Sequence, residues 1–342
     1  MAEVYASIGT RSDIAIANGD SKLPASASGS GTFASPYSMT YGSSPGDVGV
    51  GDKLAITDNT SHAGATFYYF VKSVSSNTVE VVWMYEDSGS SIGKQNPASL
   101  QYTDEYGDVV KAAHTYSRTY DTVVEWEAGL NNSNFYSAND DLTGWMHSDS
   151  EFTEENVIFN YTATTYDSIK LTVNEDDRQN GIEGQTGKVV NKPDANPGGG
   201  TASIYDLSID NFTIEWIEID MSSSTSTHIV VQTGTTNTQA RTNAVIQHML
   251  IHSWGTDQTG DPMHGILLRG GSGGYQHVFN CILYDFTESD DHVTAFNLNP
   301  SRATVKCYNN TSYDMTVTTR TDKVASGYFW GSTGTINIKN CI

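Results

Sequence analysis

The chain has 342 residues and is strongly acidic, with 18 Lys and Arg against 40 Asp and Glu and a formal net charge of −22. A protein that binds nucleic acid or an anionic membrane surface needs a clustered positive face, so this charge and the scattered basic residues exclude both classes. Hydrophobic residues make up 37% and charged residues 17%, both below the usual share, and Ser, Thr, Asn and Gly fill the difference. This balance favours a β protein with many turns and little helix.

The sequence has no pattern of a membrane span or an export signal. No run of about 18 apolar residues could cross a bilayer, and the first residues, Met1 to Tyr5, lack the basic and apolar regions of a signal peptide. We therefore expect no membrane insertion. The three cysteines, Cys281, Cys307 and Cys341, fall in the last quarter of the chain, and we expect them to be reduced and mostly buried.

The first third of the chain predicts a small antiparallel β-domain. A polar, irregular leader over residues 11–46 precedes strand patterns at 48–56, 67–71 and 78–85, which are joined by short turns. An acidic linker follows from Glu86 to about Asp108. We place the first domain at residues 1–115 and the second at residues 116–342.

One segment has the periodicity of a helix. Thr122 and Glu125 match a capping box, and Val123, Trp126 and Leu130 share one helical face. A short helix near 122–130 is therefore predicted. Its place before a strand-rich region suits a cap on the open end of a repeat array.

Five related blocks follow in the second domain, each after an apolar strand pattern. They begin at Glu215, Gln247, Asn280, Asn309 and Asn340, at intervals of 32, 33, 29 and 31 residues. A coil of about 30 residues cannot bury its inner face alone, whereas stacked coils form a continuous core. The predicted fold is all-β: a right-handed parallel β-helix, or solenoid, preceded by the small N-terminal β-domain and the capping helix.

Stacked coils would place equivalent residues in columns about 4.8 Å apart. The first predicted column is a structural ladder of amides, Gln247, Asn280, Asn309 and Asn340, with Glu215 as an irregular start. The second predicted column is Asp220, His252, Asp285 and Asp314. Such residues end strands by bonding the turn backbone, and we expect no catalytic role for them. The alternative is that they bind Ca²⁺ or act as acid and base.

Three other patterns bear on function. His248, His252, His264 and His277 fall within 30 residues, but the first two would lie about 13 Å apart on one strand, so no metal site is predicted. Carboxylates beside Arg178 suit an acidic sugar, yet a surface of net −22 would repel a uronate. Aromatic residues at turns and strand ends suit the faces of sugars, and the candidates are Trp254, Tyr284, Tyr313 and Trp330.

The stacked Asn-x-Ile-x-Tyr-Asp blocks resemble right-handed β-helix repeat proteins. The segments 8–9, 48–52, 116–120 and 126–129 look like a lineage common in bacteriophage and environmental genomes. That resemblance implies a virion or surface-appendage role, such as a decoration protein, fibre or tailspike. It also implies other virion or assembly proteins as partners, a homo-oligomer with a trimer as one option, and a cell-surface polysaccharide as a ligand.

The expected function is therefore a non-catalytic structural or adhesive component of a phage particle or another extracellular assembly. Some β-helix relatives are polysaccharide lyases or glycoside hydrolases. This enzyme class stays the alternative, because a fold does not decide activity. No cofactor is expected beyond the Ca²⁺ alternative.

Overall fold

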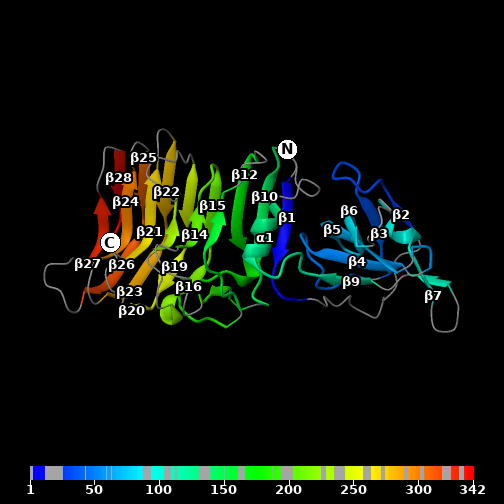
Figure 1. Ribbon diagram of the computed structural model, residues 1–342, viewed down its shortest axis with the longest axis horizontal. Helices are drawn as coiled ribbons and strands as arrows, with labels where there is room; N and C mark the ends of the chain where they lie inside the picture. Colours follow the sequence, from blue (N-terminus) through cyan, green and yellow to red (C-terminus); the bar gives the residue numbers. More distant parts are fainter. Residues whose placement is uncertain are drawn as a thin grey trace. The chain divides into compact units, whose positions relative to one another are not determined.

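The computed structural model describes residues 3–11, 26–42, 44–58, 60–62, 64–87, 94–103, 109–111, 114–130, 139–149, 151–160, 166–186, 188–193, 203–224, 229–234, 243–256, 263–270, 274–288, 292–300, 304–317, 325–330 and 335–342 (Figure 1). The chain forms two compact units. The first is Met1–Asp121 with Asn132–Trp145, and the second is Thr122–Asn131 with Met146–Ile342. Within the described ranges, no helix has both the length and the apolar character needed to cross a membrane.

The first unit is an antiparallel β-domain, as the strand patterns predict. Its six-stranded sheet has the order β2-β3-β6-β5-β4-β9, and β7 pairs with β8. The strands of these two sheets are β2 (Ala27–Ser28), β3 (Tyr37–Thr40), β4 (Lys53–Asp58), β5 (Ala65–Ser75), β6 (Thr78–Asp87), β7 (Gln101–Thr103), β8 (Val109–Lys111) and β9 (His114–Ser117). The unit also contains β1 (Glu3–Ile8) and most of β10 (Asp141–Met146), which belong to neither antiparallel sheet. A 3₁₀ turn, Pro97–Ser99, precedes β7.

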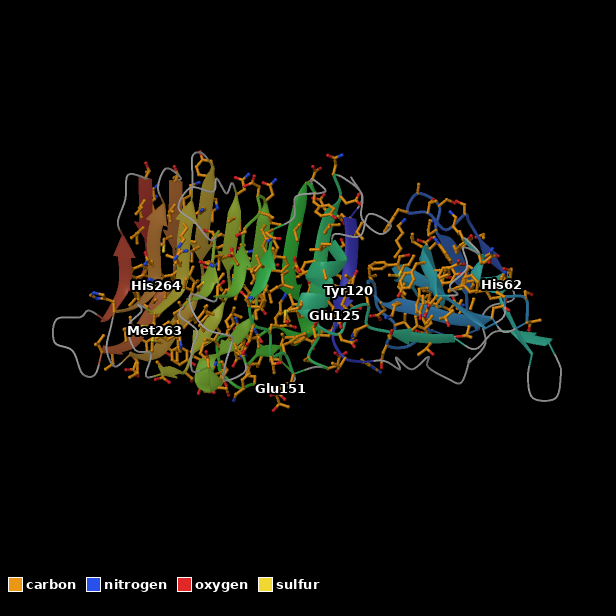
Figure 2. All side chains as sticks on the ribbon, viewed as in Figure 1. His62, Tyr120, Glu125, Glu151, Met263 and His264 are labelled. Atoms are coloured by element: carbon orange, nitrogen blue, oxygen red, sulfur yellow. The ribbon has the colours of Figure 1, made fainter. Side chains whose placement is uncertain are left out.

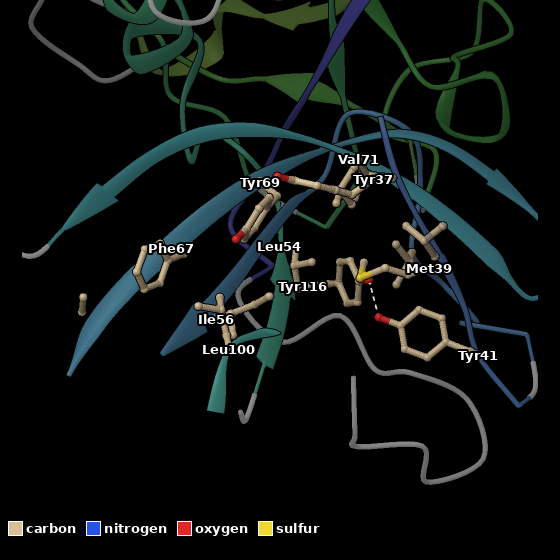
Figure 3. Close-up of a cluster of buried hydrophobic side chains, with 14 residues drawn as sticks. Tyr37, Met39, Tyr41, Leu54, Ile56, Phe67, Tyr69, Val71, Leu100 and Tyr116 are labelled. Atoms are coloured by element: carbon tan, nitrogen blue, oxygen red, sulfur yellow. Dashed lines mark hydrogen bonds between the residues drawn. The ribbon is translucent and has the colours of Figure 1, made fainter. Parts of the chain in front are cut away.

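A cluster of buried side chains forms the core of this sheet (Figure 3). Alternation along β4 buries Leu54 and Ile56, and Tyr69 of β5 packs in the same cluster. The hydroxyls of Tyr41 and Tyr116 lie 2.6 Å apart and share a hydrogen bond. Because a buried hydroxyl without a partner is costly, this pair lets two polar groups lie inside an apolar core.

The second unit is a parallel β-solenoid of about four turns, which confirms the predicted fold. Each coil crosses three parallel sheets in turn: sheet I (β12-β15-β18-β22-β25-β28), sheet II (β13-β16-β19-β23, with β20 and β26 also paired to β23) and sheet III (β11-β14-β17-β21-β24-β27). Parallel pairing of whole coils explains why the blocks repeat at a nearly constant length.

The strands of the solenoid are short, as the bounds show. They are β11 (Val157–Phe159), β12 (Ser168–Val173), β13 (Val190–Asn191), β14 (Ser203–Leu207), β15 (Phe212–Glu215), β16 (Glu218–Asp220), β17 (Ile229–Gln232), β18 (Ala244–Gln247), β19 (Leu250–His252), β20 (Trp254–Thr256), β21 (Met263–Gly270), β22 (Tyr275–Phe279), β23 (Ile282–Glu288), β24 (Val293–Pro300), β25 (Thr304–Tyr308), β26 (Thr311–Val317), β27 (Ala325–Trp330) and β28 (Thr335–Lys339). Two 3₁₀ turns, Glu175–Asp177 and Met221–Ser223, lie between strands.

The predicted capping helix is present as α1 (Val123–Leu130), the one α-helix in the described part of the chain. The hydroxyl of Thr122 accepts a hydrogen bond from the backbone N–H of Glu125 at 3.1 Å, which is one half of the capping box. The buried Trp126 packs edge-on against Phe159 of β11, with 5.9 Å between ring centroids. Since β11 is the first strand of sheet III, the helix covers an end of the stack.

A corner in the left-handed backbone conformation separates sheets I and II in successive coils. The corner residues have φ between 52° and 66°, and they are Trp216, His248, Asn280, Asn309 and Asn340. The residue after each corner faces the interior, and Ile217, Met249, Cys281 and Asn310 are all buried. The buried Asn310 side chain is satisfied, since it accepts from the Cys281 N–H at 2.9 Å and donates to the Val278 carbonyl at 3.0 Å.

The corner corrects the register of the predicted amide column. Gln247 pairs with Phe279 rather than Asn280, so Gln247 lies one position too early to join the Asn residues. The predicted column is instead two separate sets of hydrogen-bonded side chains. Gln247 donates to Glu215, whereas Asn340 donates to Asn309 at 3.2 Å and Asn309 to Asn280 at 3.4 Å. The Asn set is a surface ladder because Asn309 and Asn340 are exposed. The physical reason for the error is that Asn adopts positive φ readily and Gln does not.

Candidate functional site

Sheet II carries a row of stacked rings on its outer face, here called the ring row: His252, Tyr284 and Tyr313. The rings of His252 and Tyr284 lie 5.4 Å apart between centroids, and those of Tyr284 and Tyr313 lie 4.8 Å apart with only 2° between their planes. Tyr313 is 52% exposed. The row therefore presents an aromatic surface to solvent at its Tyr313 end.

A segment over residues 178–186, here called the strap, runs across the coils of this face. Its contacts reach three coils: Gly184 N–H donates to Glu218 Oε1 at 2.8 Å, Gln179 Nε2 donates to the His248 carbonyl at 2.8 Å, and Glu183 Oε2 accepts from the Tyr284 hydroxyl at 2.5 Å. The strap begins after a 3₁₀ turn whose first residue is capped by Asn174. It thereby holds one carboxylate, Glu183, directly beside the ring row.

Glu218 and His252 form a buried pair close to the strap. Glu218 is 1% exposed and His252 is 4% exposed. His252 Nε2 lies 3.1 Å from Glu218 Oε1, while His252 Nδ1 lies 3.0 Å from the Ser253 hydroxyl and 3.6 Å from Glu183 Oε2. Glu218 Oε2 has no hydrogen-bond partner among the described residues. The pair has the composition of an acid–base couple, but its burial keeps it from solvent.

The ring row lies in a negative field. Burial, followed by the Glu183 carboxylate that accepts its hydrogen bond, raises the pKa of the Tyr284 hydroxyl well above its ordinary value. Burial and then the charges of Glu183, Asp314 and Asp285 raise the pKa of Tyr313. Both phenols therefore stay neutral and can donate hydrogen bonds at physiological pH.

The second predicted column is wrong in register. Asp220 pairs with His252, and Tyr284 pairs with Tyr313, so these positions belong to the ring row. Asp285 and Asp314 lie one position later, at a second left-handed bend where φ is 56° and 54°. Asp tolerates this conformation, which accounts for its recurrence there. The four residues therefore do not present carboxylates and an imidazole along a single line.

Asp220 caps a turn. Its Oδ1 accepts from the Ser222 N–H at 2.9 Å, which starts the 3₁₀ turn Met221–Ser223, and its Oδ2 lies 3.3 Å from Lys192 Nζ. Burial by itself would raise the pKa of Asp220, but the hydrogen bonds from Ser222 and the charge of Lys192 together lower it. This is the structural role expected for the column at this one position.

The predicted sugar-binding aromatics divide into three groups. Tyr284 and Tyr313 lie on the outer face, as expected. Trp254 is fully buried and packs edge-on against Phe286 at 5.3 Å, so the prediction of an accessible ring at Trp254 is wrong. The side chain of Trp330 lies outside the described part of the structure.

Two residues of the candidate site were missed from the sequence, Glu183 and Glu218. Glu218 alternates with Asp220 along β16, a period-two signal that could have placed it on sheet II. Glu183 had no such signal, because it belongs to the strap and reaches Tyr284 across 101 residues. A contact between residues so far apart in the sequence depends on how the coils stack, which the local sequence pattern does not show.

The four histidines are spread over the molecule. His248 occupies the corner, where its ring stacks on Trp216 at 4.0 Å, and His252 lies on sheet II. His277 belongs to sheet I and His264 to sheet III, next to the buried Met263 (Figure 2). Among the residues that the structure describes, no group of three or more His, Cys, Asp or Glu could hold a metal ion.

The fold and the ring row define a parallel β-solenoid protein with an aromatic outer face. No protein-family model matches the sequence, and no curated protein matches it. Two solved structures are similar to the chain: the tailspike gp61 of Pseudomonas phage phi297, with 11% identity and a TM-score of 0.17, and the Gp54 tailspike of Acinetobacter baumannii bacteriophage AP22 in complex with A. baumannii capsular saccharide, with 11% identity and a TM-score of 0.23. The matches cover 97% and 99% of this chain but 57% and 58% of the tailspikes, so the chain spans somewhat more than half of their length.

Proposed function

We propose that the chain is a non-catalytic attachment component of a phage particle or a comparable extracellular assembly, and that it binds a surface glycan on the ring row. The observation that carries this proposal is the stacking of His252, Tyr284 and Tyr313 across adjacent coils, ending in the half-exposed face of Tyr313. Aromatic faces pack against the C–H faces of sugar rings, and nearby polar groups fix the orientation of the ligand.

The groups around Tyr313 suit a neutral sugar. Asp285, Asp314 and Glu183 act on Tyr313 electrostatically, and carboxylates accept hydrogen bonds from sugar hydroxyls. An acidic sugar would meet like charges at this face. The neutral Tyr313 hydroxyl adds a donor, whereas the Tyr284 hydroxyl already donates to Glu183. The ring row therefore favours neutral hexoses over uronates.

The second candidate is a glycoside hydrolase or polysaccharide lyase. The Glu218 and His252 pair supports this alternative, because a histidine held by a buried carboxylate is a common proton-transfer device. Both side chains are at least nine-tenths buried, however, and a general acid or base must come within hydrogen-bond reach of its substrate. The exposed Tyr313 end of the row therefore favours binding over catalysis.

The test is binding of the full chain to dextran and other neutral polysaccharides by affinity electrophoresis. Tyr313→Ala is expected to weaken binding about 5- to 10-fold, the loss of one stacked ring. Tyr85→Ala is the matched control, since Tyr85 is 39% exposed in the first unit. Failure to bind every neutral glycan tested, or equal binding by Tyr313→Ala and the control, would reject the proposal.

A parallel assay separates the enzyme from the attachment protein. Incubation with the same glycans and with acidic ones should release no fragments, detected by reducing ends and by the ultraviolet absorbance of unsaturated products. Release that falls about 100-fold in His252→Ala would establish the enzyme instead. An attachment component should also be found in stoichiometric amounts in purified particles.

A further inference from the structure

The outer face of sheet I differs from the rest of this acidic protein in its last three strands, β22, β25 and β28. Alternation along β22 and β25 turns Gln276, Val278, Val305 and Cys307 into the interior, where all four are buried. The alternate positions form a three-by-three grid: Tyr275, His277 and Phe279; Thr304, Lys306 and Tyr308; Thr335, Asn337 and Lys339. None of these nine residues is Asp or Glu, although the chain contains 40 of them. We call this grid the lysine face.

Both lysines of the lysine face lie over aromatic rings. Lys306 Nζ is 4.5 Å from the centroid of Tyr275, and Lys339 Nζ is 5.7 Å from that of Tyr308. Neither ammonium group forms an ion pair with a carboxylate in the described part of the chain. Tyr275 is 48% exposed. The face therefore offers positive charge and open ring surface together.

The lysine face also contains one histidine, His277. Burial and then the charge of Lys306 lower its pKa, so the imidazole is neutral at physiological pH. Its Nε2 has no hydrogen-bond partner among the described residues. That Nε2 atom is shielded from solvent, so the neutral hydrogen-bonding groups that the face presents beside the lysines come from Thr304, Thr335 and Asn337.

The net charge of −22 does not cancel this local field. Charges farther away than about 8 Å are largely screened at physiological ionic strength. Among the nine residues of the grid, the only charges that an anion meets are those of Lys306 and Lys339.

We propose that the lysine face is a binding site for an acidic polysaccharide, a chain of uronic acids or other sugars that carry carboxylates. The lysines pair with the carboxylates, and the rings of Tyr275 and Tyr308 pack against the sugar faces. The two lysines and the two tyrosines lie on neighbouring strands about 4.8 Å apart, in different columns of the grid, so a linear polymer lying across the strands meets them one after another. The site is separate from the ring row, because the corner residues Asn280, Asn309 and Asn340 lie between sheets I and II.

A protein partner fits the lysine face less well. The core of a protein interface is depleted in lysine and enriched in apolar surface. Here the nine residues of the grid are two lysines, two tyrosines, four other polar residues and a single purely hydrocarbon side chain, Phe279. Spaced charges among hydrogen-bonding groups match a hydroxylated, anionic polymer.

The experiment measures binding of the full chain to polygalacturonate and to dextran by affinity electrophoresis at low and high salt. The double variant Lys306→Met with Lys339→Met removes both charges and keeps most of the side-chain volume. It is expected to weaken polygalacturonate binding by about 10-fold or more, and to leave dextran binding unchanged. Lys53→Met is the matched control, since Lys53 Nζ also lies over a tyrosine, 6.0 Å from the centroid of Tyr68 in the first unit.

Three results would overturn the proposal: no binding of polygalacturonate, equal binding by the double variant and the control, or loss of polygalacturonate binding in Tyr313→Ala. Self-association of the chain that disappears in the double variant would also overturn it, since the face would then be an interface between copies. Failure here is distinguishable from failure of the ring row, because the ring row is tested by dextran binding and the lysine face by polygalacturonate binding. Circular dichroism and the urea midpoint of each variant show that it is folded.

Discussion

Sheets I and II of the solenoid present two aromatic outer faces with opposite charge. On sheet II, Tyr284 and Tyr313 stand among Glu183, Asp285 and Asp314. On sheet I, Tyr275 and Tyr308 stand beneath Lys306 and Lys339. Because parallel coils place their strands side by side in register, a few residues on neighbouring strands set the charge of an outer face. A solenoid can therefore carry unlike binding surfaces a few residues apart along the chain.

The outer faces of sheets I and II also differ in that only sheet II is crossed by the strap. It lies against sheet II and supplies Glu183, and it contributes no side chain to the lysine face. Part of sheet II is consequently buried beneath it, which explains why Glu218 is only 1% exposed on an outer face. Ligand access to sheet II depends on the strap, whereas access to sheet I does not.

The largest expected effect comes from breaking the attachment of the strap. Glu218→Leu leaves the Gly184 N–H and His252 without their buried acceptor, and we expect a loss of about 3 kcal/mol in the free energy of unfolding. Urea denaturation of the purified variant measures it. Glu183→Leu is the control, because the Glu183 side chain is 56% exposed and its removal should cost less than ~1 kcal/mol. Equal losses in the two variants would mean that the strap is not held by Glu218.

A charge reversal should make the lysine face resemble sheet II. The double variant Lys306→Glu with Lys339→Glu replaces attraction by repulsion, and we expect polygalacturonate affinity to fall by about 100-fold. Dextran binding should not change. Lys53→Glu adds the same kind of charge to the first unit and controls for the change in net charge. A fall of similar size in that control would indicate a general effect of charge.

The corner between the faces should give a smaller effect. Asn309 has φ of 56°, so Asn309→Ala places an alanine in the left-handed region at a cost of about 1 kcal/mol. Asn309→Gly removes the same ladder hydrogen bonds without this strain and should cost less. Asn337→Ala, on the neighbouring strand β28, is the control for loss of an amide. If Ala and Gly lower the urea midpoint equally, the ladder rather than the backbone conformation stabilises the corner.

The corner also shows how far the sequence could predict the fold. Recurring Asn positions and a constant coil length predicted the stack, since both follow from geometry that every coil must share. The register was wrong by one residue at Gln247, because a column was inferred from side-chain chemistry and the structure sorts residues by backbone conformation. Trp216 occupies the corner although tryptophan has no preference for positive φ, so its residue type gives no signal of the corner.

The candidate sites were predictable to different degrees. Tyr284 and Tyr313 followed from the repeat, and the lysine face could have been found from the period-two patterns Tyr275-x-His277 and Lys306-x-Tyr308 without an acid. The burial of Trp254 could not have been predicted from the sequence. A residue after a left-handed bend faces inward or outward according to the path of the coil. Glu183 depended on the strap, whose partners lie in other coils.

The smallest expected effect lies at the start of the ring-row column, where Lys192 partly neutralises Asp220. The hydrogen bonds from Ser222 and the charge of Lys192 lower the pKa of Asp220 below its ordinary value of 3.8. A depressed pKa in the folded state stabilises the fold above the unfolded pKa, and this contribution is lost as the pH falls through the folded value. Because both side chains are partly exposed, we expect Asp220→Asn to cost only about 0.5 kcal/mol at pH 7.

The pH dependence of this variant is the sharper measurement. The difference in unfolding free energy between the wild type and Asp220→Asn should shrink toward zero as the pH falls through the folded-state pKa of Asp220, which is lowered below 3.8, because the carboxyl group is then protonated in both states. Lys192→Met should remove part of the same stabilisation, and adding it to Asp220→Asn should cost little more, as expected for two partners of one interaction. A difference that stays constant from pH 7 to the acid limit would show that the Asp220 side chain acts through its shape in the turn and not through its charge. Asp220 would then not count among the charged groups that give sheet II its acidic outer face, whereas Glu183 still would.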